Sequence, residues 1–183
     1  MIDRLTFPSE EAAFSYFDKL HPVPAVELVG LWKGSEISTG HPFDGVLENL
    51  GWYGKRFRAD MRADALLFKK DGNRLVPIDP SPIPLGLAFR FHRLGRTEAA
   101  RNLFSHLIKH LRATGPVASL RMMRFRGDVS AAMVYDSKPV ADYFRKIDTD
   151  TLVGVLSAQG YDGHFFFQLE RVKVPDPSRQ EAA

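Results

Sequence analysis

The chain of 183 residues contains no cysteine, so a disulfide and a thiolate metal site are both excluded, and the composition suits a reducing compartment. No segment approaches the roughly 20 apolar residues that a membrane-spanning helix needs. Residues 1–4 also do not begin a basic stretch followed by an apolar one, so we expect a soluble cytoplasmic protein. A glycine-rich phosphate loop, a dinucleotide fingerprint and a G-x-S-x-G elbow are likewise missing from the sequence.

Hydrophobic residues make up 44% of the chain, which is enough for one substantial core and little for two. We therefore expect one domain. The formal charge is only +3, but residues 90–126 hold nine Lys/Arg and one acid, a net +8, while the remainder holds 16 basic and 21 acidic residues. Such a segment is typical of a solvated face with ion pairs, or of a surface for nucleic acid, anionic lipid heads or an acidic partner.

Hydrophobic spacing predicts three helices. Ser9 is placed to cap a helix over residues 10–20, and apolar residues at helical spacing predict a second helix over residues 97–111. A third, short helix is predicted over residues 139–147, because Pro139 suits a first helical position. Apolar residues follow there at i, i+3, i+4 and i+7: Val140, Tyr143, Phe144 and Ile147.

The other regular segments favour strands. Residues 66–70 and 74–78 flank Asp71-Gly72-Asn73, which predicts a hairpin because its turn needs positive φ. Three prolines in residues 79–84 cannot continue a central strand. The further predicted strands are residues 26–38, 52–58, 118–127, 128–135, 152–157 and 164–174.

The run Gly30-Leu31-Trp32-Lys33-Gly34 places a tryptophan between two glycines at a predicted strand start. A large ring in such a place suggests a plug at one end of a closed sheet. Over residues 20–58, including Thr39 to Pro42 and Gly51 to Phe57, the chain resembles the GXWXG protein family, and distantly lipocalin-like and other calycin barrels. Residues 126–171 resemble the domain of unknown function that commonly follows it. No settled activity comes with this resemblance.

Each block is too small to bury both faces of a sheet alone, so we expect the two blocks to be halves of one barrel. The fold class is mainly β with a few helices (α+β). We expect a single antiparallel calycin- or lipocalin-like barrel with an N-terminal helix, a mid-chain helix and a short helix in the C-terminal half. The expected domain covers residues 1–174, with a GXWXG half at 20–80, a candidate helical insertion at 86–118, a C-terminal half at 118–174 and a flexible tail at 175–183.

A barrel of this size can hold one small ligand in its lumen. An apolar lumen with arginine near its mouth suits an amphiphile whose acid pairs with guanidinium. We therefore expect the chain to bind a hydrophobic or amphiphilic molecule, such as an anionic lipid or fatty acid, for transport, storage or sensing. Residues 52–56 would form a rim that contacts a head group or a membrane surface, or would simply be wall residues. The candidate ligand-binding residues are Trp32, His41, Trp52, Tyr53, Lys55, Arg56, Arg124, Arg126, Phe165 and Phe167.

Arg124 and Arg126 have two interpretations, because either could meet the ligand's acid or stack over Trp32. We assign no catalytic residue, no metal ligand and no cofactor, since His106 and His110 lack a third ligand at a metal-site spacing.

Three alternatives to the binding barrel remain. The first is an enzyme acting on a small organic acid, with Tyr53, Tyr135 and Glu36 as first targets. The second is a haem-binding barrel that uses one histidine. The third is a basic surface for a partner, with nucleic acid disfavoured because aromatic residues are sparse there. The candidate haem ligands are His41, His92 and His164.

Overall fold

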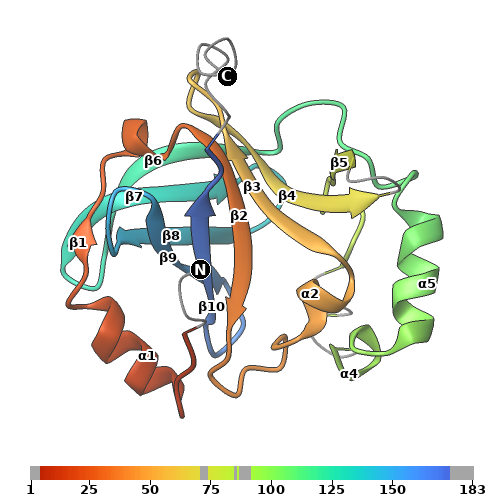
Figure 1. Cartoon of the computed structure of the whole chain (residues 1–183), viewed down its shortest axis with the longest axis horizontal. Coiled ribbons are helices and arrows are strands. Elements are labelled where there is room, and N and C mark those ends of the chain that lie inside the picture. Colours follow the sequence, from red (N-terminus) through yellow and green to blue (C-terminus); the bar gives the residue numbers. More distant parts are fainter. Residues whose placement is uncertain (1–4, 71–73, 85, 87–91, 174–183) are drawn as a thin grey trace, which may run out of the picture.

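A computed structural model of the chain describes residues 5–70, 74–84, 86 and 92–173. Its centre is a closed antiparallel β-barrel of eight strands, with two extra strands and a few helices at the margins (Figure 1). Barrel strands that are neighbours in space are also consecutive along the chain, except that β5, which pairs with β4 outside the barrel, comes between β4 and β6 in the sequence. The last strand, β10, pairs with the first barrel strand, β2, and closes the cylinder. The predicted mainly β barrel is therefore confirmed.

The barrel is an up-and-down meander. Its strands are β2 (Gly30–Ile37), β3 (Trp52–Phe57), β4 (Arg62–Lys70), β6 (Ala118–Phe125), β7 (Asp128–Tyr135), β8 (Val140–Lys146), β9 (Thr151–Ala158) and β10 (Phe165–Arg171). The extra strands are β1 (His21–Pro22), which pairs with β8, and β5 (Arg74–Pro77), which pairs with β4. The helices are α1 (Glu10–Phe17), η1 (Ala25–Leu28), α2 (Val46–Asn49), α4 (His92–Gly95) and α5 (Glu98–Leu107).

Local sequence explains where several of these elements begin and turn. The Ser9 hydroxyl accepts a hydrogen bond from the backbone N–H of Ala12 at 3.2 Å, which caps α1 as predicted. Between β6 and β7, Arg126 has φ 48° and Gly127 has φ 91°, as a tight hairpin turn requires. The β4–β5 hairpin is also present, and its turn, residues 71–73, lies outside the described residues.

The predicted helix over residues 139–147 is wrong, because this segment is strand β8. Val140 and Phe144 point into the lumen, and Tyr143 and Ile147 pack outside the barrel beneath α1. Both faces of the strand are covered, so apolar residues occur on both. Their combined spacing imitates the helical pattern.

The molecule has two hydrophobic cores. The first fills the barrel lumen and runs from Leu28 and Trp32 at one end to Phe165 at the other. The second lies outside the barrel, where α1 covers β9 and β10 through Phe14, Phe17 and their neighbours. Arg145 is buried beneath this helix, where its guanidinium contacts the ring of Phe17 and pairs with Asp128. This second core fixes α1 against the outer wall of the barrel.

A β-bulge in β3 decides which of its side chains enter the lumen. Trp52 and Phe57 both belong to the lumen core although they are five positions apart. In a regular strand, side chains at an odd spacing point to opposite faces of the sheet. The pairing of β3 with β4 shifts register on both sides of Gly54, whose φ is +146°. The bulge turns Lys55 inward, where its side chain is 2% exposed.

Several predictions fall on the part of the chain that is not described. The predicted flexible tail, residues 175–183, lies outside the described residues, as do residues 87–91 within the candidate insertion and the side chain of His92. Among the described residues, no helix combines the length and apolar character needed to cross a membrane.

Candidate functional site

One end of the barrel is closed by Trp32, as its motif predicts. The ring is fully buried, and its Nε1 donates a hydrogen bond to the carbonyl of Leu28 in η1 at 2.6 Å. The guanidinium of Arg171 lies 4.2 Å from the ring centroid and donates to the carbonyl of Val29 at 2.9 Å. The arginine over Trp32 is therefore Arg171 from the last strand, and the predicted stacking by Arg124 or Arg126 is wrong.

Four of the candidate residues lie outside the barrel. Arg126 pairs with Asp18 at 2.6 Å and covers the ring of Phe14, and Arg124 donates to the carbonyl of Gly127. Tyr53 lies beneath the amine of Lys69, and Arg56 pairs with Asp64. None of these four side chains lines the lumen pocket described below.

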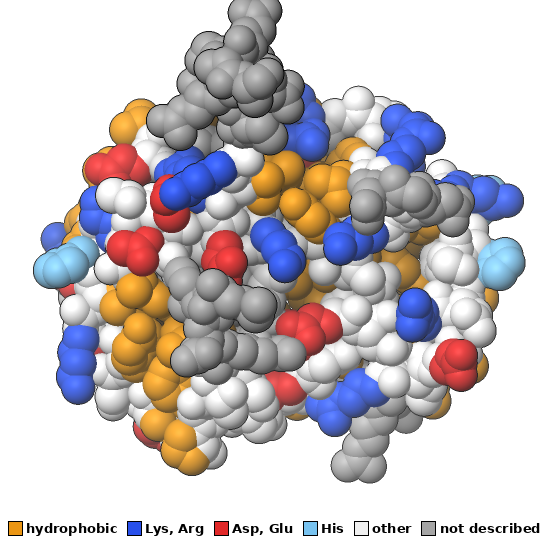
Figure 2. Space-filling view, in the orientation of Figure 1, with side chains coloured by type: hydrophobic (Ala, Val, Ile, Leu, Met, Phe, Trp, Pro, Cys, Tyr) orange, Lys and Arg blue, Asp and Glu red, His pale blue; other side chains and the backbone are white. Residues whose placement is uncertain are grey.

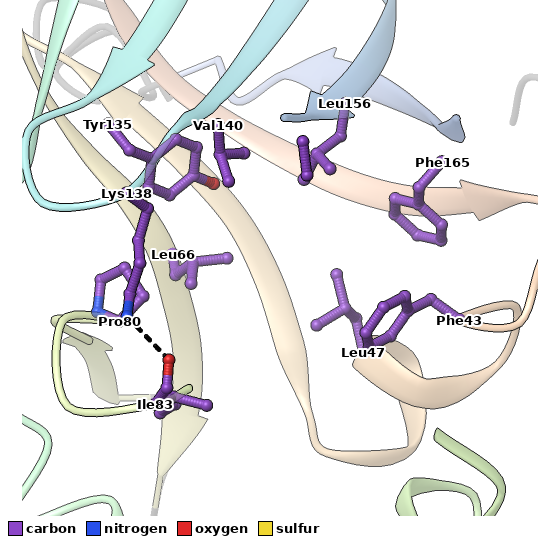
Figure 3. Close-up of a pocket in the computed structure, with 11 residues that line it drawn as sticks. Phe43, Leu47, Leu66, Pro80, Ile83, Tyr135, Lys138, Val140, Leu156 and Phe165 are labelled. Atoms are coloured by element: carbon purple, nitrogen blue, oxygen red, sulfur yellow. Dashed lines mark hydrogen bonds between the residues drawn. The ribbon is translucent and has the colours of Figure 1, made fainter. Parts of the chain in front are cut away.

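The end of the barrel nearest α2 contains a pocket of about 170 Å³ (Figure 3). Its walls come from the ends of barrel strands, from the α2 segment and from the proline-containing stretch that follows β5. The lining residues are Phe43, Leu47, Leu66, Pro80, Ile83, Tyr135, Lys138, Val140, Leu156, Ala158 and Phe165. All of them are apolar except for the hydroxyl of Tyr135 and the amine of Lys138.

The two polar groups lie on the same side of the pocket (Figure 3). Tyr135 and Lys138 face Phe43, Leu47 and Phe165 across it. The Lys138 amine donates to the carbonyls of Ser81 at 3.0 Å and Ile83 at 2.8 Å. These bonds hold the amine at the wall with a further N–H available, because an ammonium group has three donors. The two polar groups are nonetheless almost fully covered, so the surface of the pocket itself is almost wholly apolar.

A buried ion pair lies one layer deeper in the lumen. Lys55 Nζ is 2.7 Å from Asp142 Oδ2, with side-chain exposures of 2% and 0%, and it also donates to the carbonyl of Ala65 at 3.0 Å. The ammonium lies 4.9 Å from the ring centroid of Phe167 and 5.9 Å from that of Tyr135. Tyr135 thus belongs to both the pocket and the ion-pair layer.

Burial governs the ionisation of this layer. Burial raises the pKa of Asp142, although the charge of Lys55 and hydrogen bonds from Lys55 and Tyr135 partly oppose the shift. Burial, together with the negative charge of Asp142, also raises the pKa of Tyr135 well above its ordinary value. Tyr135 is therefore a neutral phenol at physiological pH, and it brings no charge to the pocket.

The segment from Thr39 to Leu50 covers the pocket. Glu36 at the end of β2 accepts hydrogen bonds from the N–H groups of Gly45 and Glu48, and burial raises its pKa. Asp44 accepts from the N–H groups of Thr39 and Gly40 at 3.0 and 2.9 Å. These bonds shape the turn that directs Phe43 and Leu47 over the pocket.

The structure distributes the predicted site residues between layers. Phe165 lines the pocket, while Phe167, Trp52 and Lys55 occupy the lumen beneath it. The ring of His41 lies at the rim, 5.7 Å from that of Phe165. Sequence reasoning did not find most of the lining residues, among them Lys138 and the apolar residues of the 80–83 stretch. The proline signal there indicates a loop but not that the loop packs over the barrel mouth.

The residues proposed for the enzyme and haem-binding alternatives do not come together in one site. Of the three enzyme targets, only Tyr135 reaches the pocket, since Tyr53 is on the outer wall and Glu36 holds the covering segment. His164 pairs with Glu10 at 2.7 Å outside the barrel, and His41 Nδ1 accepts from the N–H of Phe43. Within the described part of the chain, no group of three metal-ligating side chains occurs.

The fold and pocket define this chain as a closed up-and-down β-barrel, plugged by tryptophan at one end and hollowed at the other. Residues 15–72 match the family model described as GXWXG protein, and residues 116–171 match the model of a domain of unknown function (DUF4334). The predicted resemblance and the order of its blocks are confirmed. The first block supplies β2 to β4, and the second supplies β6 to β10.

A solved structure shares this architecture. The crystal structure of a protein from Thermomonospora curvata is similar over 92% of this chain and 90% of that chain, with 26% sequence identity and a TM-score of 0.67. No curated protein matches the chain by sequence.

Proposed function

We propose that this chain binds a small hydrophobic or amphiphilic molecule in the pocket at the α2 end of the barrel. The observation that carries the proposal is a pocket of about 170 Å³ whose walls are apolar apart from one hydroxyl and one amine. Apolar cavities with a few convergent polar groups are typical of ligand sites.

The size of the pocket limits the ligand. An apolar cavity of about 150 Å³ holds benzene, so the present pocket suits about six to ten non-hydrogen atoms. A long-chain fatty acid would fit only if the segment over residues 39–50 moved. At roughly 0.6 kcal/mol per atom, a ligand of eight to ten atoms would bind with a dissociation constant of about 100 μM.

The chemistry of the walls supports an anionic head group. Lys138 is the cation among the described lining residues, and its amine lies on the same side as the Tyr135 hydroxyl. An amphiphile would place its carboxylate or phosphate against this side and its apolar part against Phe43, Leu47 and Phe165. A short-chain or aromatic acid meets both the size and the charge of the pocket.

Filling the pocket tests the proposal. Ala158→Leu adds about half the volume of the cavity, so octanoate affinity measured by calorimetry is expected to fall at least tenfold. Ala141→Leu is the matched control and should leave affinity unchanged, because Ala141 follows Val140, the cross-strand partner of Ala158, and its side chain alternates away from the lumen. Equal affinities in both variants, or a wild-type protein that binds neither octanoate nor octanol, would refute the proposed site.

Removing the amine tests the orientation of the ligand. Lys138→Gln is expected to weaken octanoate binding about five- to tenfold, because a charge-assisted contact of about 1 kcal/mol or more is lost. The affinity for octanol should change less than twofold, which also shows that the pocket remains intact. If both ligands weaken equally, Lys138 shapes the pocket without recognising the acid.

A further inference from the structure

The outer helix α5 is attached to the barrel by a small contact. None of its residues is buried, and its principal aromatic contact joins Phe104 to Phe68, with ring centroids 4.8 Å apart. Leu103 is 61% exposed and Leu107 is 44% exposed, and Leu94 in the adjoining α4 is 58% exposed. Single exposed leucines are ordinary, but three on one short helical pair form an apolar surface that needs an explanation.

A basic groove runs between α5 and the β4–β5 hairpin. One part is lined by Lys69, Lys70, Arg101, Phe104, Ser105 and Ile108, together with Leu50 and Gly51. The adjoining part is lined by Lys70, Arg74, Val76, Ile108, Lys109 and Arg112. The described lining residues thus include six cations and no acid, and none of the six forms an ion pair with a described acidic residue. In Figure 2, Lys and Arg side chains border the region where Figure 1 places β5 and α5.

The leucines and the cations occupy opposite flanks of the same helix. At 100° per residue, with Phe104 facing the barrel, Leu103 and Leu107 project to one side. Arg101 projects to the other side, and Lys109, in the turn directly after the helix, lines the groove there. A helix that carries leucine beside long basic side chains can lie in a membrane interface, with its leucines at the acyl boundary and its cations at anionic head groups. This pattern fits nucleic acid less well, because Phe104 is the one aromatic residue among the described groove residues and it already packs on Phe68.

We propose that α5 and the basic groove dock on a membrane surface that contains anionic phospholipid. This interaction is separate from ligand binding in the lumen. The two sites are nevertheless connected, because Asn49 in α2 donates to the carbonyls of Gly95 and Thr97 at 2.8 and 3.0 Å, and Arg96 donates to the carbonyl of Pro42. Docking would bring the covering segment of the pocket to the bilayer, where apolar molecules are concentrated.

Vesicle flotation with the full chain tests the docking surface without any added pocket ligand. We expect binding to vesicles of 30% phosphatidylglycerol and 70% phosphatidylcholine in 50 mM NaCl, and at least tenfold weaker binding in 300 mM NaCl. Arg101→Gln with Lys109→Gln should weaken binding about 25-fold, since each interfacial cation contributes about fivefold. Leu103→Ser with Leu107→Ser should weaken it at least tenfold.

The matched control is Arg121→Gln with Arg124→Gln, which removes the same charge from exposed positions on β6. This variant should bind vesicles within twofold of the wild-type protein, and far-UV circular dichroism should show all three variants folded. Absence of vesicle binding in 50 mM NaCl would overturn the proposal. Equal losses in the control would also overturn it, as would salt-sensitive binding to single-stranded RNA in place of vesicles. Because octanoate binding is measured separately, failure of either proposal leaves the other open to its own test.

Discussion

Replacing Lys55 with methionine is expected to destabilise the protein by about 3–5 kcal/mol, because it leaves the carboxylate of Asp142 buried without its cation. The pair is wholly inside the lumen, with Lys55 Nζ 2.7 Å from Asp142 Oδ2. Methionine nearly matches the volume of lysine, so the loss measures charge rather than a cavity. Urea unfolding followed by tryptophan fluorescence gives the free energy of unfolding.

The double variant Lys55→Met with Asp142→Asn separates the charge effect from a general effect of substitution. Without a buried charge, it should recover at least 2 kcal/mol of the loss, because an uncharged amide costs much less to bury than a carboxylate. A loss below about 1 kcal/mol in the single variant, or a double variant no more stable than the single one, would show that the pair is not the source of stability.

The deficit of Lys55→Met should also depend on pH. Burial raises the folded pKa of Asp142, and removing Lys55 removes the charge that opposes this shift. A carboxyl group whose folded pKa exceeds its unfolded value favours the fold at low pH and loses that contribution as pH rises through the folded pKa. The difference between variant and wild type should therefore shrink as pH falls from 7 toward about 4, because the buried carboxyl of the variant takes up a proton and no longer needs a cation.

The barrel could be predicted from the sequence because its local signals agree with its long-range structure. The adjacent strands predicted over residues 118–127 and 128–135, the hairpin over residues 66–78 and the plug at Trp32 are all features that the fold contains. The helix predicted over residues 139–147 was wrong for a physical reason. Apolar residues on both faces of a covered strand can have the same spacing as the apolar face of a helix. For a short apolar segment, the spacing of hydrophobic residues does not distinguish a helix from a strand that is buried on both faces, and tertiary packing decides between them.

The pocket was much harder to predict than the barrel. Its walls combine the 39–50 segment, the prolines after β5 and the ends of β7 to β10, which meet only after the sheet closes. In the sequence, only the glycine itself indicates the β-bulge at Gly54. This bulge nevertheless determines that Lys55 faces the lumen and Arg56 faces outward. Residues 52–56 were therefore recognised as unusual without an indication of which side chain entered the lumen.

Replacing Gly34 with alanine is expected to cost about 2–4 kcal/mol, because the new methyl group would overlap a ring already in place. An ideal Cβ at Gly34 would lie 2.6 Å from Cζ3 and 2.8 Å from Cζ2 of Trp52, and closer still to Cη2. Gly30 has a related role, since its Cβ would lie 3.3 Å from the Arg171 guanidinium that covers Trp32. The two glycines of the family motif thus make room for the side chains around the lumen.

Trp52→Phe provides the decisive comparison, because phenylalanine lacks the three ring carbons that the alanine at Gly34 would meet. In a double-mutant cycle, Gly34→Ala should cost at least about 1 kcal/mol less in the Trp52→Phe background than in the wild-type chain. Gly115→Ala is the matched control, because a Cβ there meets nothing within 4 Å. It should change stability by no more than about 0.5 kcal/mol. If the costs at Gly34 are equal in both backgrounds, the glycine is required for its backbone rather than for Trp52, and the motif then specifies strand geometry instead of the filling of the lumen.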